Sequence, residues 1–306
     1  MRFVLSADQR DFAAALDALV SASDPVDVAR AWADGDTGPG LKLWSRLAEQ
    51  GVTSLATDAS AVEVCVAFEV LGRHAVPGPW VESAAYLPLA LGHAIEGVAT
   101  VAHPPHVPFA LDADVADRVY VVGDEGIGEA ESAELVRSVD PTRRLFRVVS
   151  TGSTTEMALS TETGDLERAF DLAVLATGAQ LLGCGERLLA DSVVYVKQRR
   201  QFGREIGSYQ AIKHRLADVR IALDFARPLV WGAALAPDET QARDVSAAKV
   251  ACADAAYLAS RAALQVHGAV GYTQELDLSL WITKVRALVG AWGTPAFHRA
   301  RVLEAL

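Results

Sequence analysis

The sequence contains little cysteine. Its 306 residues include three cysteines, Cys65, Cys184 and Cys252, which lie far apart and form no C-x-x-C or other metal-ligand spacing. We therefore expect three small buried side chains and no metal site. The odd number of cysteines, together with a start that shows no signal-peptide pattern, favours the reducing cytoplasm.

Positive charge and long apolar runs are also scarce. The 28 lysines and arginines are outnumbered by 39 aspartates and glutamates, so the net charge is -11. Because a broad nucleic-acid interface needs a basic face that displaces counterions, we expect no nucleic-acid partner. The longest stretch without charge or histidine, Leu172 to Gly185, is shorter than the ~20 residues of a membrane span. Hydrophobic residues nevertheless make up 51% of the chain, which predicts an extensive core and subunit interfaces.

The chain divides into three stretches with different patterns, and these predict its domains. Residues 1–92 show amphipathic helical spacing that begins after an N-cap serine, Ser6. Residues 93–158 change to short β-rich runs between Pro, Gly and Asp turns. Residues 159–306 return to long helical segments. This order predicts an α+β fold with an N-terminal helical domain, a reduced middle β domain and a C-terminal helical bundle. The predicted strands cover residues 97–102, 107–112, 118–122 and 144–149, and the predicted long helices cover about 166–200, 208–235 and 241–266.

The most informative stretch is a helix end, a tight glycine-containing turn and the start of a new helix. Its notable side chains are Arg199, Arg200, Phe202, Arg204 and Gln210. Guanidinium groups beside a helix N-terminus can hold a pyrophosphate through charge-assisted hydrogen bonds. The aromatic ring could stack near an adenine. The alternative is a solvated basic turn that packs against acidic residues.

A second stretch, L-Q-V-H-G-A-V-G-Y-T-Q-E, contains small residues that allow a ligand or backbone to approach closely. These are Gly268, Ala269 and Gly271, and Gln265 before them offers both a hydrogen-bond donor and an acceptor. The alternative is an ordinary turn between helices. We expect His267, within this stretch, to pack or to hydrogen-bond rather than to act in catalysis.

Taken together, the two stretches resemble the acyl-CoA dehydrogenase family. The pattern R-x-Q-F-G-x-x-I-G-x-x-Q-A-I at residues 199–212 is similar to the family's arginine–phenylalanine–glycine motif. Residues 265–272 are similar to its Q-x-x-G-G-x-G-Y motif. The segments W-S-R-L-A-E-Q-G-V-T-S-L-A and E-V-L-G-R-H-A-V-P-G-P-W-V-E-S-A resemble its N-terminal helical domain, in particular that of short actinobacterial subunits for sterol-derived and other bulky acyl-CoA. The resemblance covers nearly the whole chain.

The resemblance implies a fold, a cofactor and a reaction. It implies an acyl-CoA dehydrogenase-like fold whose C-terminal part is a four-helix bundle. It also implies FAD, an acyl-CoA substrate and electron-transferring flavoprotein as the electron acceptor. The reaction is α,β-dehydrogenation, in which a carboxylate removes the α-proton and a hydride passes to the flavin. In the family both motifs reach across a subunit interface to a neighbour's FAD. The implied FAD-binding residues are Arg199, Phe202, Gln210, Gln265, Gly268 and Ala269.

Both positions at which the family carries its catalytic glutamate hold other residues here. Counting from the two motifs places Trp292, in A-W-G-T, at one position and Ala173 at the other. Neither side chain accepts a proton, and we expect Trp292 to fill a core or an interface. Asp171 and Glu167 lie on the same predicted helix as Ala173, but Asp171 is two residues away, which turns a side chain roughly 200° around a helix.

The middle domain departs from the family as well. The flavin-contacting L-T-E-P-G-A-G-S-D loop is absent, and Ala269 replaces the second glycine of the G-G pair, where its methyl group would crowd cofactor phosphates. We therefore predict a subunit that lacks its own catalytic base and completes the FAD site of a partner acyl-CoA dehydrogenase subunit, as an α2β2 hetero-oligomer. One alternative is a self-sufficient homotetramer with a displaced base such as Glu275 or Asp277. The other is a flavin-free scaffold or regulatory subunit.

Overall fold

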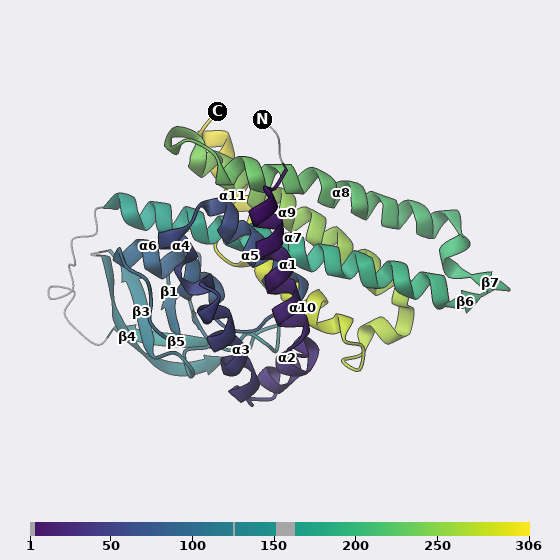
Figure 1. The fold of residues 1–306 in the computed structure, drawn as a ribbon, viewed down its shortest axis with the longest axis horizontal. Coiled ribbons are helices and arrows are strands. Elements are labelled where there is room, and N and C mark those ends of the chain that lie inside the picture. The colour runs from purple at the N-terminus through teal and green to yellow at the C-terminus, as the bar shows by residue number, and fades with distance from the viewer. Residues whose placement is uncertain (1–3, 125, 151–162) are drawn as a thin grey trace.

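The computed structural model describes residues 4–124, 126–150 and 163–306. The N-terminal part is helical and wraps one side of the molecule (Figure 1). Its elements are α1 (Ala7–Ser21), α2 (Pro25–Ala33), α3 (Gly38–Glu49), η1 (Val52–Ser54), α4 (Leu55–Asp58), α5 (Ala61–Arg73), η2 (Glu82–Tyr86) and α6 (Leu87–Leu91). Ser6 caps α1, because its hydroxyl accepts from the Gln9 backbone while the Gln9 side chain accepts from the Ser6 backbone. The predicted N-cap is thus confirmed.

A five-stranded sheet follows, with the order β1-β3-β4-β5-β2. Its strands are β1 (Ala99–Ala102), β2 (Ala110–Leu111), β3 (Arg118–Gly123), β4 (Gly126–Val136) and β5 (Leu145–Ser150). β1 and β3 are parallel, whereas the other pairs are antiparallel. Four strands coincide with predicted stretches, but the prediction was wrong to omit β4. Its sequence G-I-G-E-A-E-S-A-E-L-V is poor in β-branched and aromatic residues, and pairing with both β3 and β5 decides its conformation.

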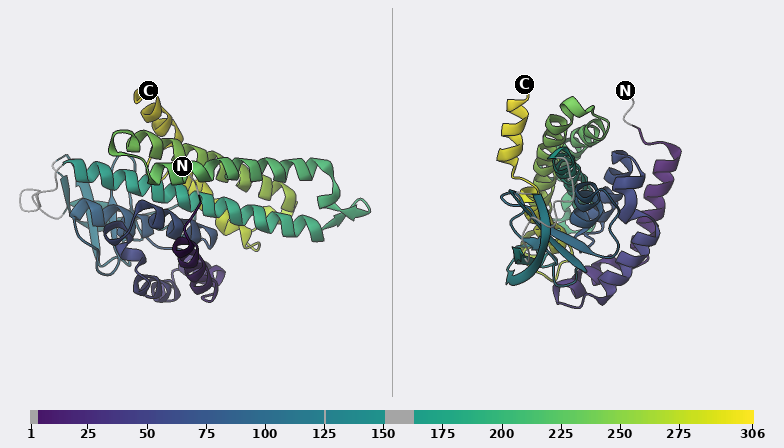
Figure 2. Two further views of the ribbon diagram at one scale, coloured as in Figure 1. Left: turned by 45° about the horizontal axis from the view of Figure 1, so that its top comes forward. Right: turned by 90° about the vertical axis from the view of Figure 1, so that its left-hand side faces the viewer.

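The C-terminal part forms a helical bundle in which α7, α8, α9 and α10 pack together, with α11 against α9. Their bounds are α7 (Thr163–Gln198), α8 (Gln210–Ala234), α9 (Asp238–His267), α10 (Leu278–Gly290) and α11 (Pro295–Glu304). The long helices run side by side, with the sheet near one end and a small hairpin at the other (Figures 1 and 2). The predicted domain boundary after residue 92 falls between α6 and β1 and stays a prediction, and the boundary after residue 158 lies outside the described residues.

The bundle is joined to the N-terminal helices by a close contact between α5 and α7. A Cβ atom at Gly72 would lie 2.0 Å from the Gln180 carbonyl oxygen, and one at Gly183 would lie 1.9 Å from the Glu69 carbonyl oxygen. Only glycine permits the two helices to approach this closely.

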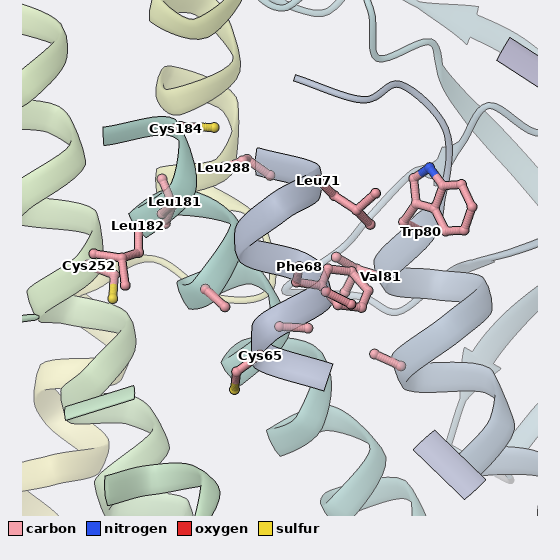
Figure 3. Close-up of a cluster of buried hydrophobic side chains, with 14 of the residues drawn as sticks. Cys65, Phe68, Leu71, Trp80, Val81, Leu181, Leu182, Cys184, Cys252 and Leu288 are labelled. Atoms are coloured by element: carbon pink, nitrogen blue, oxygen red, sulfur yellow. The ribbon is translucent and has the colours of Figure 1, made fainter. Parts of the chain in front are cut away.

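The three cysteines are buried and free, as expected. They lie on α5, α7 and α9 among apolar side chains that include Phe68 and Leu182 (Figure 3). Burial raises the pKa of the Cys184 and Cys252 thiols to about 12, so both stay protonated at neutral pH. None of the helices in the described part of the chain is long and apolar enough to cross a membrane.

Candidate functional site

A two-stranded hairpin connects α7 to α8 at the end of the bundle remote from the sheet (Figure 1). It consists of β6 (Arg200–Gln201) and β7 (Arg204–Glu205), followed by the 3-10 turn η4 (Ile206–Ser208). The turn residues Phe202 and Gly203 both have positive φ, 52° and 82°, as a two-residue type I′ hairpin requires. The Phe202 side chain is also 89% exposed. A bulky residue in this conformation costs about 1–2 kcal/mol, and such strain is concentrated at functional sites.

The hairpin presents three exposed arginines, Arg199, Arg200 and Arg204. The backbone around them is fixed, because the Ile206 amide donates to the Arg199 carbonyl oxygen at 2.8 Å. Arg204 lies over the Tyr209 ring, with its guanidinium carbon 3.9 Å from the ring centroid. Across residues 4–124, 126–150 and 163–306, none of the three makes an ion pair. Their charge is therefore open to a ligand or a partner. Gln210, at the first position of α8, is exposed beside them.

The glycine loop follows α9 as the 3-10 turn η5 (Gly268–Tyr272). Gly268 has φ +63°, and a Cβ atom there would meet nothing within 4 Å, so this backbone is open. Ala269 is exposed next to it. Gly271 differs, because a Cβ atom would lie 3.1 Å from the Leu264 carbonyl oxygen. The open space expected of the loop thus lies at Gly268, whereas Gly271 allows the turn to pack on its own helix.

Two side-chain contacts bring the hairpin and the glycine loop to the same end of the bundle. Arg215, on α8, donates to the exposed Gln265 side chain at the end of α9. The Tyr195 ring, on α7, stacks on the His267 ring with centroids 4.1 Å apart. His267 is buried, and its Nδ1 lies 2.8 Å from the Ala263 carbonyl oxygen. As expected, this histidine packs and hydrogen-bonds.

At the expected base positions the interior is closed. Trp292, in the turn between α10 and α11, is 1% exposed and has φ 55°. Its ring centroid lies 4.9 Å from that of Tyr86, 6.0 Å from that of Phe170 and 6.3 Å from that of His103. Ala173 is fully buried. Trp292 therefore fills the core, as predicted, and leaves no proton acceptor at either position.

The carboxylates considered as substitute bases lie elsewhere or are already paired. Asp171 is buried and forms an ion pair with Arg301; burial raises the pKa of Asp171, while Arg301 opposes that shift. Glu167 and Glu275 are exposed on the surface. Asp277 is also exposed and pairs with an arginine of α2 at 2.6 Å. None of the four lies free inside the aromatic cluster around Trp292.

The structure adds one buried carboxyl group that the sequence analysis did not single out. Glu82, in the π-helical turn η2, is 1% exposed and lies near the Trp292 indole. Burial raises the pKa of Glu82, although Arg143 and Trp292 act in the opposite direction. One of its oxygens has no hydrogen-bond partner. The only sequence signal was an acid within the apolar run P-W-V-E-S-A-A-Y-L.

Comparison with known proteins decides the family. Residues 165–306 match the model of the acyl-CoA dehydrogenase C-terminal domain. The chain is 30% identical over 308 residues to the acyl-CoA dehydrogenase IpdE2 of Mycolicibacterium smegmatis. The aligned region covers 94% of this chain and 95% of the relative. The chain belongs to the acyl-CoA dehydrogenase family. Members of this family are FAD-dependent oxidoreductases.

Solved acyl-CoA dehydrogenases share the fold. The ChsE4-ChsE5 complex of Mycobacterium tuberculosis contains a chain with TM-score 0.81 and 20% identity, covering 99% of this chain and 98% of that one. A variant of the Tcur3481-Tcur3483 steroid acyl-CoA dehydrogenase gives TM-score 0.77 and 17% identity, covering 97% of each chain. The predicted fold of helical domain, small sheet and helical bundle is thus confirmed.

FAD fits only part of this acyl-CoA dehydrogenase chain. The exposed arginines of the hairpin and the open backbone at Gly268 suit an anionic pyrophosphate. The stretch after β1 does not suit a flavin ring. There His106 packs on Phe297 with ring centroids 4.1 Å apart, and His103 faces Phe170 at 5.6 Å. The two histidines after β1 therefore pack against aromatic side chains of α7 and α11 of the same chain.

Proposed function

We propose that this chain is a subunit of a hetero-oligomeric acyl-CoA dehydrogenase that lacks its own base and completes the FAD site of a partner subunit. The observation that carries the proposal is the contrast between the two ends of the bundle. Trp292 closes the interior where a base would act, whereas Phe202 and the unpaired arginines are held outward in solvent. A catalytic pocket has been lost while a strained, exposed binding feature is retained.

The proposed FAD contacts follow from the chemistry of each side chain. Arg199 would hold the pyrophosphate with a bidentate guanidinium, and Phe202 would stack on the adenine side. Gln210 and Gln265 would donate to polar edges of the cofactor, and Gly268 with Ala269 would let its phosphates approach the backbone. When bound, FAD supplies the hydride acceptor. This chain would orient the cofactor and shield it from water.

The partner subunit would carry the glutamate, the flavin loop and most of the acyl-CoA pocket. A hetero-oligomer is supported by the structural likeness to a chain of the ChsE4-ChsE5 complex, and we propose an α2β2 composition for it. A bulky, sterol-derived acyl group is supported by the likeness to a steroid acyl-CoA dehydrogenase. Electron-transferring flavoprotein would reoxidise the flavin. The three buried, unpaired cysteines accord with a cytoplasmic complex.

Co-expression with a full-length acyl-CoA dehydrogenase subunit from the same organism tests the proposal. We expect this chain to be colourless when purified alone, and yellow and tetrameric with the partner, as measured by flavin absorbance and native mass. Arg199→Ala should lower the FAD affinity of the complex about tenfold or more, because a hydrogen bond to a charged group contributes roughly 1.5–3 kcal/mol. The matched control Arg10→Ala removes an exposed arginine of α1 and should leave the flavin content unchanged.

Two outcomes would contradict the proposal and favour an alternative. Stoichiometric FAD and acyl-CoA turnover by this chain alone would indicate a self-sufficient enzyme. Unchanged flavin binding by the Arg199→Ala complex would indicate a flavin-free scaffold, with the hairpin serving assembly only.

A further inference from the structure

A pocket separate from the hairpin and from the Trp292 cluster opens where the sheet meets α2 and α10. Its volume is about 480 Å³, which is within the usual range for small-molecule sites. The turn between β4 and β5 forms one wall, and Ala33 at the end of α2 and Leu280 at the start of α10 form another. The α2 and α10 walls are tied together, because Arg30 donates to the Gln274 carbonyl oxygen at 3.1 Å and pairs with Asp277. Figure 1 shows α2 close to α10, on the side of the bundle that faces the N-terminal helices.

The charge of this pocket is opposite to that of the protein. Three arginines line it, Arg137, Arg143 and Arg144, together with one acid, Asp140. The acid is already neutralised, since its carboxylate lies 3.3 Å from the buried Lys284 ammonium. The chain as a whole carries a net charge of -11. A concentration of cations in one cavity of such a protein raises the local concentration of anions.

Two of the three guanidinium groups are free to bind a ligand. Arg144 is held by Asp114, with 3.1 Å between its Nη2 and a carboxylate oxygen. Arg143 is half-buried and Arg137 is exposed. Throughout the described part of the chain, neither of these two makes an ion pair. Glu82 and Asp112 are near enough to Arg143 for its charge to lower their pKa values, but neither forms an ion pair with it, so its guanidinium group can still bind a phosphate or carboxylate with two parallel hydrogen bonds.

The remaining lining is suited to an apolar body with a few polar groups. Leu135 and Val139 are 59% and 58% exposed at the pocket, so apolar surface is left uncovered there. Ser279 and Thr283, on the first turns of α10, add hydroxyl groups, and the N-terminal end of that helix adds partial positive charge. Apolar walls with a few convergent polar groups are typical of small-molecule sites.

We propose that this pocket binds a small molecule with an oxyanion head, held by Arg143, and an apolar body packed against Leu135 and Val139. The inference does not depend on the proposed FAD role. The site lies at the N-terminal end of α10, and its lining residue Gln274 follows the glycine loop by two residues, whereas the β6–β7 hairpin lies at the far end of the bundle (Figure 1).

Calorimetric titration of the full chain tests the site, with phenyl phosphate, benzoate and inorganic phosphate as probes. We expect one saturable site for phenyl phosphate or benzoate, and weaker binding of inorganic phosphate, which lacks the apolar body. Comparison of the first two probes distinguishes a phosphate ester from a carboxylate as the natural head group. Arg143→Ala should weaken binding about tenfold or more. Arg147→Ala is the matched control, because Arg147 lies on β5 outside the pocket and pairs with Glu134.

Two further variants keep the result decisive. Val139→Trp blocks the pocket at an exposed position where folding is not at risk, and it should abolish binding even if Arg143→Ala proves unstable. Arg199→Ala should leave binding unchanged. Absence of saturable binding by the wild-type chain, or binding lost with Arg199→Ala and retained with Val139→Trp, would overturn the assignment.

Discussion

A buried lysine in the bundle makes the stability of the protein depend on pH. Lys249, on α9, is 1% exposed, and its ammonium group donates to the Leu288 carbonyl oxygen at 2.7 Å. That bond fixes the last turn of α10 just before the turn that carries Trp292. Burial lowers the pKa of Lys249 from its usual 10.5 to about 7, because the charged form loses its hydration. We predict that Lys249→Met changes how stability depends on pH.

Proton binding to Lys249 determines whether stability rises or falls with pH. Between pH 7 and pH 10.5 the unfolded chain holds a proton on Lys249 that the folded chain has released, so wild-type stability rises with pH across this interval. Below pH 7 both states are protonated and the full cost of the buried charge is present. At about 1.4 kcal/mol per pH unit, the advantage of the methionine variant should fall by about 3–4 kcal/mol between pH 7 and pH 10. The lost hydrogen bond costs about 1–3 kcal/mol at every pH.

Urea unfolding of both proteins at pH 6 to 10 measures the difference directly, and other titrating groups cancel in the comparison. The control Lys213→Met removes an exposed lysine of α8 and should follow the wild-type curve. A difference in unfolding free energy between Lys249→Met and wild type that stays constant from pH 6 to pH 10 would contradict the prediction. It would mean that water or a local rearrangement solvates the ammonium group in the folded protein.

Three other predictions concern the hairpin and the closed interior. Phe202→Gly removes a bulky side chain from a left-handed backbone conformation, so the unfolding free energy should stay within about 1 kcal/mol of wild type. FAD release from the partner complex, followed by flavin fluorescence, should become at least about tenfold faster. A hairpin without a cofactor role would leave the release rate unchanged. Glu82→Gln should stabilise the chain at neutral pH, because burial raises the pKa of Glu82 above its usual 4.5 and the stability of the wild type falls as pH rises through the pKa of the folded state. This gain in stability should be absent below pH 4.5. Thermal melts at neutral pH and below pH 4.5 check the prediction. Arg301→Ala leaves the Asp171 carboxylate buried without its partner and should lower the unfolding free energy in urea by about 3–5 kcal/mol. The double variant Asp171→Asn, Arg301→Ala should recover part of this loss. Equal losses in the single and double variants would show that the broken ion pair is not the cause.

Local sequence signals predicted the elements whose stability is local. Ser6 indicated the start of α1 because an N-cap residue and its hydrogen-bond partner lie three residues apart in the sequence. The long bundle helices were found to within a few residues because their apolar spacing extends over many turns. β4 was missed because a strand rich in Glu, Ser and Ala has no strand signal of its own, and its pairing partners lie elsewhere in the chain.

The sequence by itself determined the family pattern, the unpaired cysteines and the absence of a glutamate at Ala173 and Trp292, since each depends only on which residue occupies a position. Only the tertiary structure decided what surrounds those positions. It packs Tyr86 against Trp292 from a distant segment, and it buries Lys249 and Glu82 without a full counter-charge. It also gathers the arginines of the β4–β5 turn into a cavity against α10. Burial and electrostatic environment arise from contacts between segments far apart in the chain, so no local pattern could specify them.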